Sequence, residues 1–185
     1  SNLVAGDTNG TADIFVHDLT TGATTRVSVD SSGTQGNGES KYPSISADGR
    51  YVAFMSRATN LVSGDTNARA DIFLHDRNTG TTTRVSVDSS GTQANDNSDQ
   101  KPSISSDGHY VVFSSMASNL VTGDTNAQRD IFVHNLSTGA TTRVSVDSRG
   151  NQRNNTSQYP SISADGRYVV FMSRATNLVP GDTNA

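Results

Sequence analysis

The chain has 185 residues, a formal net charge of −4, 32% hydrophobic residues, no Cys and no Trp. The acidic balance argues against a nucleic-acid partner, and no apolar run approaches the length that crosses a membrane, so we expect neither partner. The absence of Cys excludes disulfides and thiolate metal sites. Abundant Ser, Thr, Asn, Asp and Gly favour many short strands joined by polar turns over a helical protein.

The sequence repeats itself with a period of 58 or 59 residues. The segment TRVSVD begins at residues 25, 83 and 142, and the segment PSIS begins at residues 43, 102 and 160. A third segment, DIF, begins at residues 13, 71 and 130. We therefore treat residues 1–185 as a single repeat domain with three units, followed by a short restart of the pattern.

Each unit contributes four strand-like segments, which we name strands A to D. Strands C and D come first, within residues 11–30. Full sets of four follow over residues 43–88 and 102–147, and strands A and B alone follow within residues 160–174. Apolar and polar residues alternate between Asp-Gly and Thr-Gly turns, which predicts antiparallel hairpins. Four antiparallel strands at a fixed period predict an all-β protein, a β-propeller with three blade equivalents; a β-solenoid is the structural alternative.

The run YPSISADGRYVAFMS, together with DIFVHDLTTG, resembles the TolB-like, or PD40, family of WD40-related propeller repeats. The pattern is present in all three units, and the second unit departs from it by carrying His109 where the others carry Arg50 and Arg167. The resemblance implies a propeller of six to eight blades, usually bacterial and often periplasmic or extracellular. It implies no reaction, since such propellers mostly bind or gate.

The order of strands leaves half a blade at each end of the repeat. Three blades are too few to close a ring, because propellers have four to eight. Two chains placed head to tail would complete a six-bladed ring, with each chain supplying strands A and B to the other's strands C and D. We expect such a homodimer, because open strand edges otherwise promote aggregation. The alternatives are a fragment of a longer repeat array and a filament whose contacts do not close.

A loop containing GDTN precedes each strand C and is a candidate calcium site. Its oxygen-bearing residues are spaced i, i+2 and i+6, which suits the hard oxygen ligands of Ca²⁺. The loop also resembles the calcium loops of FG-GAP propellers, although it is two residues shorter and lacks their third carboxylate. The alternative is a structural turn, because Asp and Asn readily bond their own backbone. The candidate ligands are Asp7, Asn9, Asp13, Asp65, Asn67, Asp71, Asp124, Asn126 and Asp130.

No residue pattern points to catalysis. His17, His75 and His134 recur in strand C on different blades, so we interpret them as packing or hydrogen-bonding residues. The strand D arginines, Arg26, Arg84 and Arg143, are interpreted as solvated charges at the blade edge. There is no GxSxG nucleophile elbow and no phosphate-binding glycine loop, and we expect no enzyme and no cofactor beyond the possible Ca²⁺.

The segments between strands D and A vary most from unit to unit, whereas the strands barely change. Variable polar loops on a rigid scaffold are where binding residues usually lie, and this composition suits a protein or a glycan. The alternative is a set of solvated loops with no ligand. The predicted binding face comprises Glu39, Tyr42, Asp96, Asp99, Arg149, Arg153 and Tyr159.

Three functions remain open from the sequence. The first is a non-enzymatic binding scaffold, and the second is a self-assembling repeat protein, natural or designed. The third is the gating propeller of a larger hydrolase or of a secreted multidomain protein.

Overall fold

A computed structural model describes residues 3–182, and within that range every regular element is a strand. No helix there could cross a membrane. The strands are β1 (Phe15–His17), β2 (Thr24–Arg26), β3 (Ser40–Ile45), β4 (Tyr51–Ser56), β5 (Asp71–Asp76), β6 (Thr81–Arg84), β7 (Ser103–Ile104), β8 (Tyr110–Ser115), β9 (Asp130–Asn135), β10 (Thr141–Arg143), β11 (Ser157–Ile162) and β12 (Val169–Ser173).

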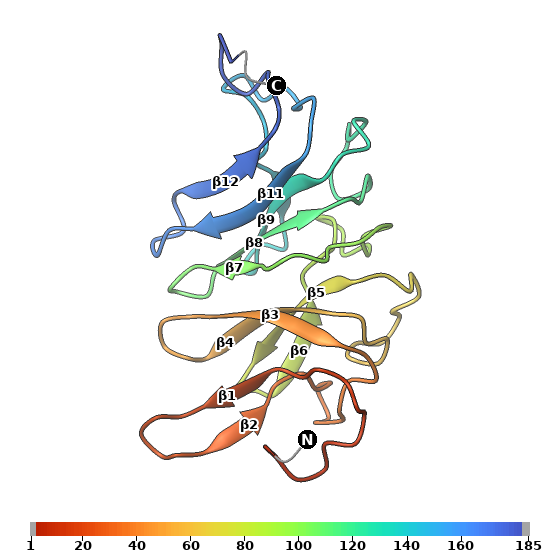
Figure 1. The fold of residues 1–185 in the computed structure, drawn as a ribbon, viewed down its shortest axis with the longest axis vertical. Coiled ribbons are helices and arrows are strands. Elements are labelled where there is room, and N and C mark those ends of the chain that lie inside the picture. Colours follow the sequence, from red (N-terminus) through yellow and green to blue (C-terminus); the bar gives the residue numbers. More distant parts are fainter. Residues whose placement is uncertain (1–2, 183–185) are drawn as a thin grey trace.

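The strands form four antiparallel sheets that follow one another along the molecule (Figure 1). Two sheets are complete blades, β3-β4-β5-β6 and β7-β8-β9-β10. The other two are half-blades, β1-β2 near the N-terminus and β11-β12 near the C-terminus, and they lie at opposite ends of the molecule (Figure 1). The predicted four-stranded antiparallel blade, with a half-blade at each end, is confirmed.

The inner strand differs from the expectation in two ways. In the first blade β3 begins at Ser40, three residues before the expected Pro43. In the second blade β7 is only two residues long, because that unit carries one extra residue before Pro102. Strands β3 and β11 instead contain a register shift, between Lys41 and Ser44 in β3.

The hydrophobic cores lie between neighbouring sheets, not within one blade. One face of the first blade, with Ala53 and Ile72, packs against Ile104 and Phe113 of the second blade. Its other face packs on the N-terminal half-blade, and the second blade packs on the C-terminal half-blade in the same way. Successive side chains of a strand point to opposite faces of its sheet, so alternate residues of one strand belong to two different cores.

The strand A elements mark the side on which the blades converge. The hydroxyl of Ser44 in β3 accepts a hydrogen bond from the Ile104 amide of β7 (3.3 Å). The hydroxyl of Ser103 in β7 accepts one from the Ile162 amide of β11 (3.3 Å). Adjacent inner strands are thus linked from blade to blade, as expected around a propeller axis.

The two ends expose apolar surface that is covered elsewhere. Val170 is 68% exposed, whereas the equivalent Val112 of the second blade is fully buried. Ile45 is 50% exposed, whereas Ile104 of the second blade is 7% exposed. Both differences arise because, within residues 3–182, no further sheet covers these two residues.

Candidate functional site

Each GDTN loop folds over an arginine that comes from strand D of the same unit. In the first unit, Arg26 Nη1 lies 3.7 Å from Asp7 Oδ1 and 3.9 Å from Asp13 Oδ2. The Gln35 side-chain amide donates to both of these oxygens at 2.9 Å. Asn9 points its amide nitrogen at Asp13 Oδ2 (3.2 Å). The two carboxylates thus face a guanidinium and amide donors.

A similar cluster recurs in the other two units, although in the second Gln93 accepts from Arg84 and the buried Asp65 Oδ1 has no hydrogen-bond partner within residues 3–182. Arg84 Nη1 lies 3.9 Å from Asp71 Oδ2, and Asn67 donates to that oxygen at 3.1 Å. Arg143 Nη1 lies 3.2 Å from Asp124 Oδ1 and 3.9 Å from Asp130 Oδ2. The side chains of Arg26, Arg84 and Arg143 are only 11%, 7% and 10% exposed. Their interpretation as solvated edge charges is therefore wrong, because each runs beneath its own GDTN loop.

The donor set of these loops does not fit calcium. A Ca²⁺ ion needs six to eight oxygen ligands. Here the asparagine presents nitrogen, and the positive charge is already supplied by arginine. Within residues 3–182, no three His, Asp or Glu side chains converge on a point that could hold a metal. Burial raises the pKa of the Asp71 and Asp124 carboxyls, and the nearby Asp130 charge adds to the effect at Asp124.

A serine connects each cluster to the start of strand C. The Ser28 hydroxyl donates to Asp13 Oδ1 at 2.6 Å and accepts from the Ile14 amide at 3.1 Å. Ser86 makes the same pair of bonds with Asp71 and the Ile72 amide. Because the carboxylate, serine and strand amide form one chain of bonds, the cluster fixes the loop to the blade. We assign it a structural role.

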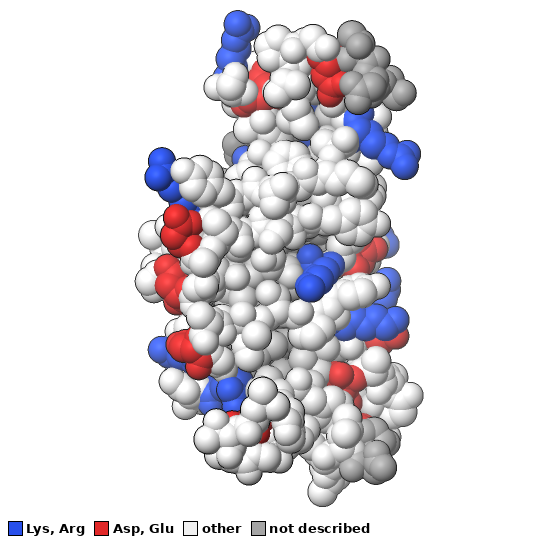
Figure 2. All heavy atoms as spheres, turned by 60° about the vertical axis from the view of Figure 1, so that its left-hand side comes forward, with Lys and Arg blue, Asp and Glu red and all other residues white. Residues whose placement is uncertain are grey.

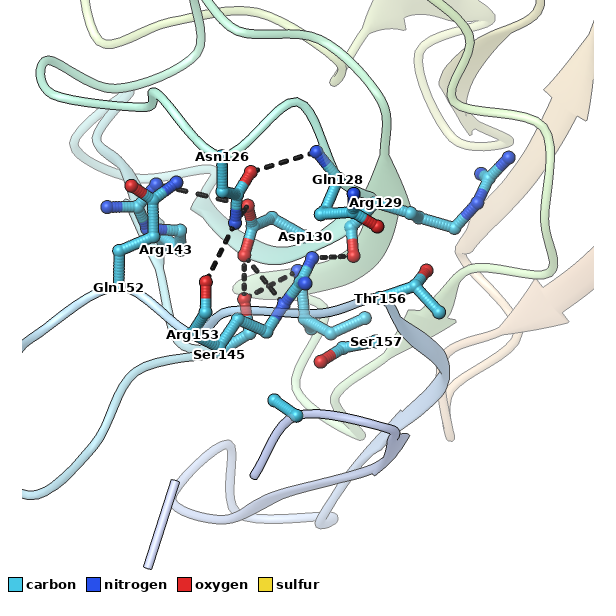
Figure 3. A network of polar contacts seen from close by, with 12 residues as sticks. Asn126, Gln128, Arg129, Asp130, Arg143, Ser145, Gln152, Arg153, Thr156 and Ser157 are labelled. Carbon is cyan, nitrogen blue, oxygen red and sulfur yellow. Dashed lines mark hydrogen bonds and ion pairs between the residues drawn. The ribbon is translucent and has the colours of Figure 1, made fainter. Parts of the chain in front are cut away.

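The third unit adds a second arginine to its cluster (Figure 3). Arg153 Nε lies 2.9 Å from Asp130 Oδ1, and both side chains are fully buried. Arg153 also donates to the Arg129 carbonyl. Burial lowers the pKa of Arg153, and the Asp130 carboxylate opposes that shift. The prediction that Arg153 belongs to the binding face is wrong, because its side chain turns inward to this carboxylate.

The remaining residues of the predicted face lie near the surface, but on separate units. Tyr42 is 46% exposed and Tyr159 is 63% exposed, and Arg149 is also exposed. Asp99 pairs with Arg129 (2.6 Å), and Asp96 pairs with Arg69 (3.7 Å). Glu39 pairs with Lys41 (2.6 Å). The acidic residues therefore meet neighbouring basic groups, and the seven predicted residues are not gathered into one pocket.

Charge is distributed without one dominant sign on the face shown in Figure 2. Lys, Arg, Asp and Glu side chains lie along both long margins of the molecule, and the band between them is mostly uncharged (Figure 2). This face therefore offers no extended single-sign patch to an ionic ligand.

Two of the exposed tyrosines, Tyr42 and Tyr159, have an unusual backbone. Tyr42 has φ 58° and Tyr159 has φ 55°, and each directly precedes a proline within a bulged inner strand. Bulky residues seldom take this left-handed conformation, and such residues concentrate at ligand sites. The equivalent Lys101 has no positive φ, because the extra residue of its unit replaces the bulge. The sequence motif Tyr-Pro marked these positions, but it did not predict their conformation.

The repeated histidines act as hydrogen-bonding residues, as predicted. In every unit the ring Nδ1 lies 2.8–2.9 Å from a strand D hydroxyl, on Thr24, Thr82 and Thr141. Burial lowers the pKa of His75 and His134. These groups span two strands of one blade and do not meet across blades.

The grooves of the molecule are repeated as well. One of about 320 Å³ lies between Ser31, Val62 and Thr82, and one of about 470 Å³ lies between Ser89, Val121 and Thr141. A third, of about 330 Å³, lies between Ser148 and Val179, and no strand D threonine lines it. Recurrence of one groove at each blade junction is typical of packing between repeats.

Comparison with solved structures gives the fold. TolB from Acinetobacter baumannii is 22% identical with a TM-score of 0.53, over 89% of this chain and 33% of that chain. The tricorn protease is 14% identical with a TM-score of 0.55, over 90% of this chain and 13% of that chain. Porphyromonas gingivalis dipeptidyl peptidase 4 is 14% identical with a TM-score of 0.50, over 86% of this chain and 18% of that chain.

No protein-family model matches the sequence, and no curated protein matches it. The chain spans about a third of the length of the A. baumannii TolB. The identities are low, but the likeness covers most of this chain and agrees with the strand order and blade pattern described above. The chain therefore has the β-propeller fold of these structures, here with three blade equivalents.

Proposed function

We propose that the chain is a non-enzymatic propeller scaffold that associates with a second copy through its two half-blades. One observation carries the proposal: residues at the ends are exposed where their equivalents in the middle are buried. Met172 of β12 is 48% exposed, whereas the equivalent Met55 of β4 is 3% exposed. Burying such surface is favourable at roughly 25 cal/mol per Å². A second copy offers the complementary half-blade.

We assign no catalytic role to the polar clusters. Each is present in all three units, and in each the carboxylate at the start of strand C lies beside the strand D arginine of the same unit. A single active site normally breaks such symmetry, because one nucleophile or one acid–base pair does the chemistry.

The ligand of the scaffold is proposed to be a protein or a glycan. The loops between strands D and A and the exposed tyrosines Tyr42 and Tyr159 would form the contact surface. Aromatic rings beside hydroxyl and amide groups suit both kinds of ligand. A location in the periplasm or outside a bacterial cell is part of this proposal, and the resemblance to TolB-like repeats supports it.

The mass of the chain in solution tests the self-association. Light scattering after size exclusion is expected to give a sharp species of twice the 19.5 kDa chain mass. A monomer, or a broad distribution that grows with concentration, would contradict it. A glycan array and a pull-down with a Tyr42→Ala, Tyr159→Ala variant as control then test the ligand.

A second candidate function is the propeller of a larger peptidase. The likeness to the tricorn protease and to P. gingivalis dipeptidyl peptidase 4 favours it, since the chain covers only 13% and 18% of those proteins. Sequencing the coding region on both sides of this segment tests it. A hydrolase domain in the same reading frame would favour this candidate over the first.

A further inference from the structure

We propose that β12 of one copy pairs with β1 of a second copy in the register that joins β4 to β5, and that Arg167–Asp18 and Tyr168–Gly49 contacts specify this pairing. The inference rests on the proposed self-association and deepens it by naming the contacting residues. It is drawn from an ion pair that occurs once inside the chain and from packing and hydrogen-bond contacts that occur twice, all of which are left incomplete at the ends.

The first contact is an ion pair that follows the repeat. In the first blade, Arg50 of the turn before β4 donates to Asp76 of β5 through both Nε (2.9 Å) and Nη2 (2.7 Å). In the second blade both positions have changed together, to His109 and Asn135. The ends restore the charged residues, with Arg167 beside β12 and Asp18 beside β1.

The Arg167 and Asp18 groups are prepared for that pair. The Arg167 guanidinium stacks 4.9 Å from the Tyr168 ring, as Arg50 stacks 4.6 Å from Tyr51. Asp18 accepts the Thr20 amide at 2.8 Å, as Asp76 accepts the Asn78 amide at 2.9 Å. Asp18 is held by its turn in the same way as the paired Asp76.

The strand register follows from the complete blades. Strands β4 and β5 place Ala53 opposite Leu74 and Phe54 opposite Phe73, and β8 and β9 place Val112 opposite Val133. Transferred to the ends by the repeat, this register places Val170 opposite Val16 and Phe171 opposite Phe15 of the second copy. A shift by one residue would turn every apolar side chain to the wrong face.

The exposed apolar residues then acquire partners. Ala53 and Ile104 belong to the core between the two complete blades, and Val112 and Ile162 belong to the core between the second blade and β11-β12. The next pair in this series is Val170 with Ile45 of the second copy. These two residues are 68% and 50% exposed in the chain alone.

A tyrosine-on-glycine contact gives the second specific feature. The Tyr51 ring lies on Gly108 of the next blade so closely that an added Cβ would come within 2.3 Å of it. The Tyr110 ring lies on Gly166 in the same way, with 2.6 Å. The next pair in the series is Tyr168, which is 59% exposed, with Gly49 of the second copy. Within 4 Å of a Cβ added at Gly49, the described part of the chain places only Arg77 Nη1, at 3.5 Å, and this group donates to the Gly49 carbonyl at 2.6 Å.

Hydrogen bonds from a threonine hydroxyl to a backbone carbonyl of the preceding sheet also recur from blade to blade. Thr82 Oγ1 donates to the Val29 carbonyl, and Thr141 Oγ1 donates to the Val87 carbonyl, both at 2.6 Å. The next donor to this series is Thr24 of the second copy, toward the carbonyl of Val146. It would also supply the strand D threonine that the groove beside Ser148 lacks.

The number of chains in the ring follows from the repeat. Each chain supplies three blade equivalents, and propellers have four to eight blades. With the proposed pairing, two copies of residues 1–185 supply six blade equivalents, which lies in that interval, and the two interfaces are identical.

Engineered cysteines test the register, because the chain has no Cys of its own. Val16→Cys with Val170→Cys places two thiols opposite each other across the interface, within reach of a disulfide. Mild oxidation is expected to give a covalent dimer on a non-reducing gel. The control, Phe15→Cys with Val170→Cys, points its thiols to opposite faces and is expected not to crosslink.

The outcomes separate the two proposals. A parent chain that is monomeric by light scattering would overturn the proposed self-association and this pairing with it. A parent dimer in which the control crosslinks and the matched pair does not would overturn the register alone. A ladder of higher species would overturn the closed two-chain ring.

A charge reversal tests the ion pair. In the dimer each substitution occurs at two interfaces, so a weakening of about tenfold at each becomes roughly a hundredfold in the dimer Kd. We expect that loss for Arg167→Asp and for Asp18→Arg, and recovery to within about tenfold when the two are combined. Arg174→Asp, which alters an exposed charge beyond the end of β12, is the matched control. Equal effects of the control and Arg167→Asp on Kd, or no recovery in the double variant, would overturn the pair.

Discussion

Arg153 and Asp130 form an ion pair that solvent does not reach: Nε lies 2.9 Å from Oδ1, and both side chains are 0% exposed. The position of Arg153 is occupied by Gly36 in the first unit and by Ala94 in the second. The other two units therefore hold the same carboxylate without this arginine. The pair is an addition to a cluster that is already complete.

Replacing Arg153 by Ala is consequently expected to be mild. Asp130 keeps Arg143, Ser145 and Asn126, which correspond to the partners of Asp71 in the second cluster. We expect a loss of less than about 2 kcal/mol in the free energy of unfolding, measured by urea titration, instead of the roughly 3–5 kcal/mol typical of a broken buried pair.

The opposite substitution is the informative control. Asp130→Asn removes the carboxylate and leaves the buried Arg153 facing a neutral group, whereas Arg143 keeps Asp124 at 3.2 Å. A loss of about 3–5 kcal/mol is expected by the same titration. If Arg153→Ala were the more damaging of the two, the arginine would be an essential part of the third cluster.

Two glycines in equivalent turns should respond differently to alanine. Gly108→Ala brings a Cβ to 2.3 Å from the Tyr51 ring at a φ of +73°, whereas Gly49→Ala at +70° meets nothing closer than 3.5 Å. The positive φ costs about 1 kcal/mol in both, and displacement of the ring adds about 1–3 kcal/mol in Gly108→Ala. Thermal unfolding at a protein concentration below the dimer Kd measures the stability loss of both variants. Equal losses would mean that the Tyr51 ring moves aside at no cost in free energy.

The left-handed tyrosines are expected to be dispensable for stability. Tyr42→Gly loses a half-exposed ring but removes the strain of φ 58°, so the free energy of unfolding should change by less than about 1 kcal/mol. Tyr51→Gly, whose ring packs on Gly108, should lose about 3–5 kcal/mol. Calorimetry of both variants compares them, and a large loss for Tyr42→Gly would place that ring in the fold instead of at a binding surface.

Stability should fall as the solution is acidified below the ordinary histidine pKa of 6.5. Burial lowers the pKa of His75 and His134 in the folded chain, so between pH 6.5 and their lowered values the unfolded chain binds more protons than the folded one. The contribution of the two neutral histidines to the free energy of unfolding is therefore fully present above pH 6.5. It is lost as the pH drops toward the pKa values of His75 and His134 in the folded chain. Melting curves from pH 7.5 to 5 should show the decline, and His75→Gln with His134→Gln should flatten it. An unchanged slope in that double variant would assign the decline to other groups.

Chelation should leave the protein unaffected. Arg26 lies beside Asp7, Arg84 beside Asp71 and Arg143 beside Asp124, so Ca²⁺ bound at these carboxylates would have to displace a guanidinium. We expect the same melting temperature in EDTA and in millimolar Ca²⁺. Because a ligand of the folded state raises its stability, a rise of several degrees with Ca²⁺ would reinstate the metal site.

The strands were predictable because their signals are local and written three times. Period-two alternation and Gly turns gave each hairpin, and comparison of units separated the constant strands from the variable loops. Burial was not predictable in the same way. Arg84 looks solvated in the sequence, and only the fold of residues 60–70 over β6 shows that its charge is enclosed. Likewise Arg153 replaces the Gly36 and Ala94 of the other units, and such variation is typical of a binding residue. Its side chain is nevertheless buried against Asp130.

The placement of the cores has a consequence for how such a protein grows. Each of the three cores is formed by two neighbouring sheets. One sequence repeat therefore does not contain a complete core, because half of each core comes from the next repeat. One added unit brings one new junction and leaves the two terminal faces as they were. Stability should then rise stepwise with the number of junctions, and unfolding should begin at a terminal half-blade and move inward.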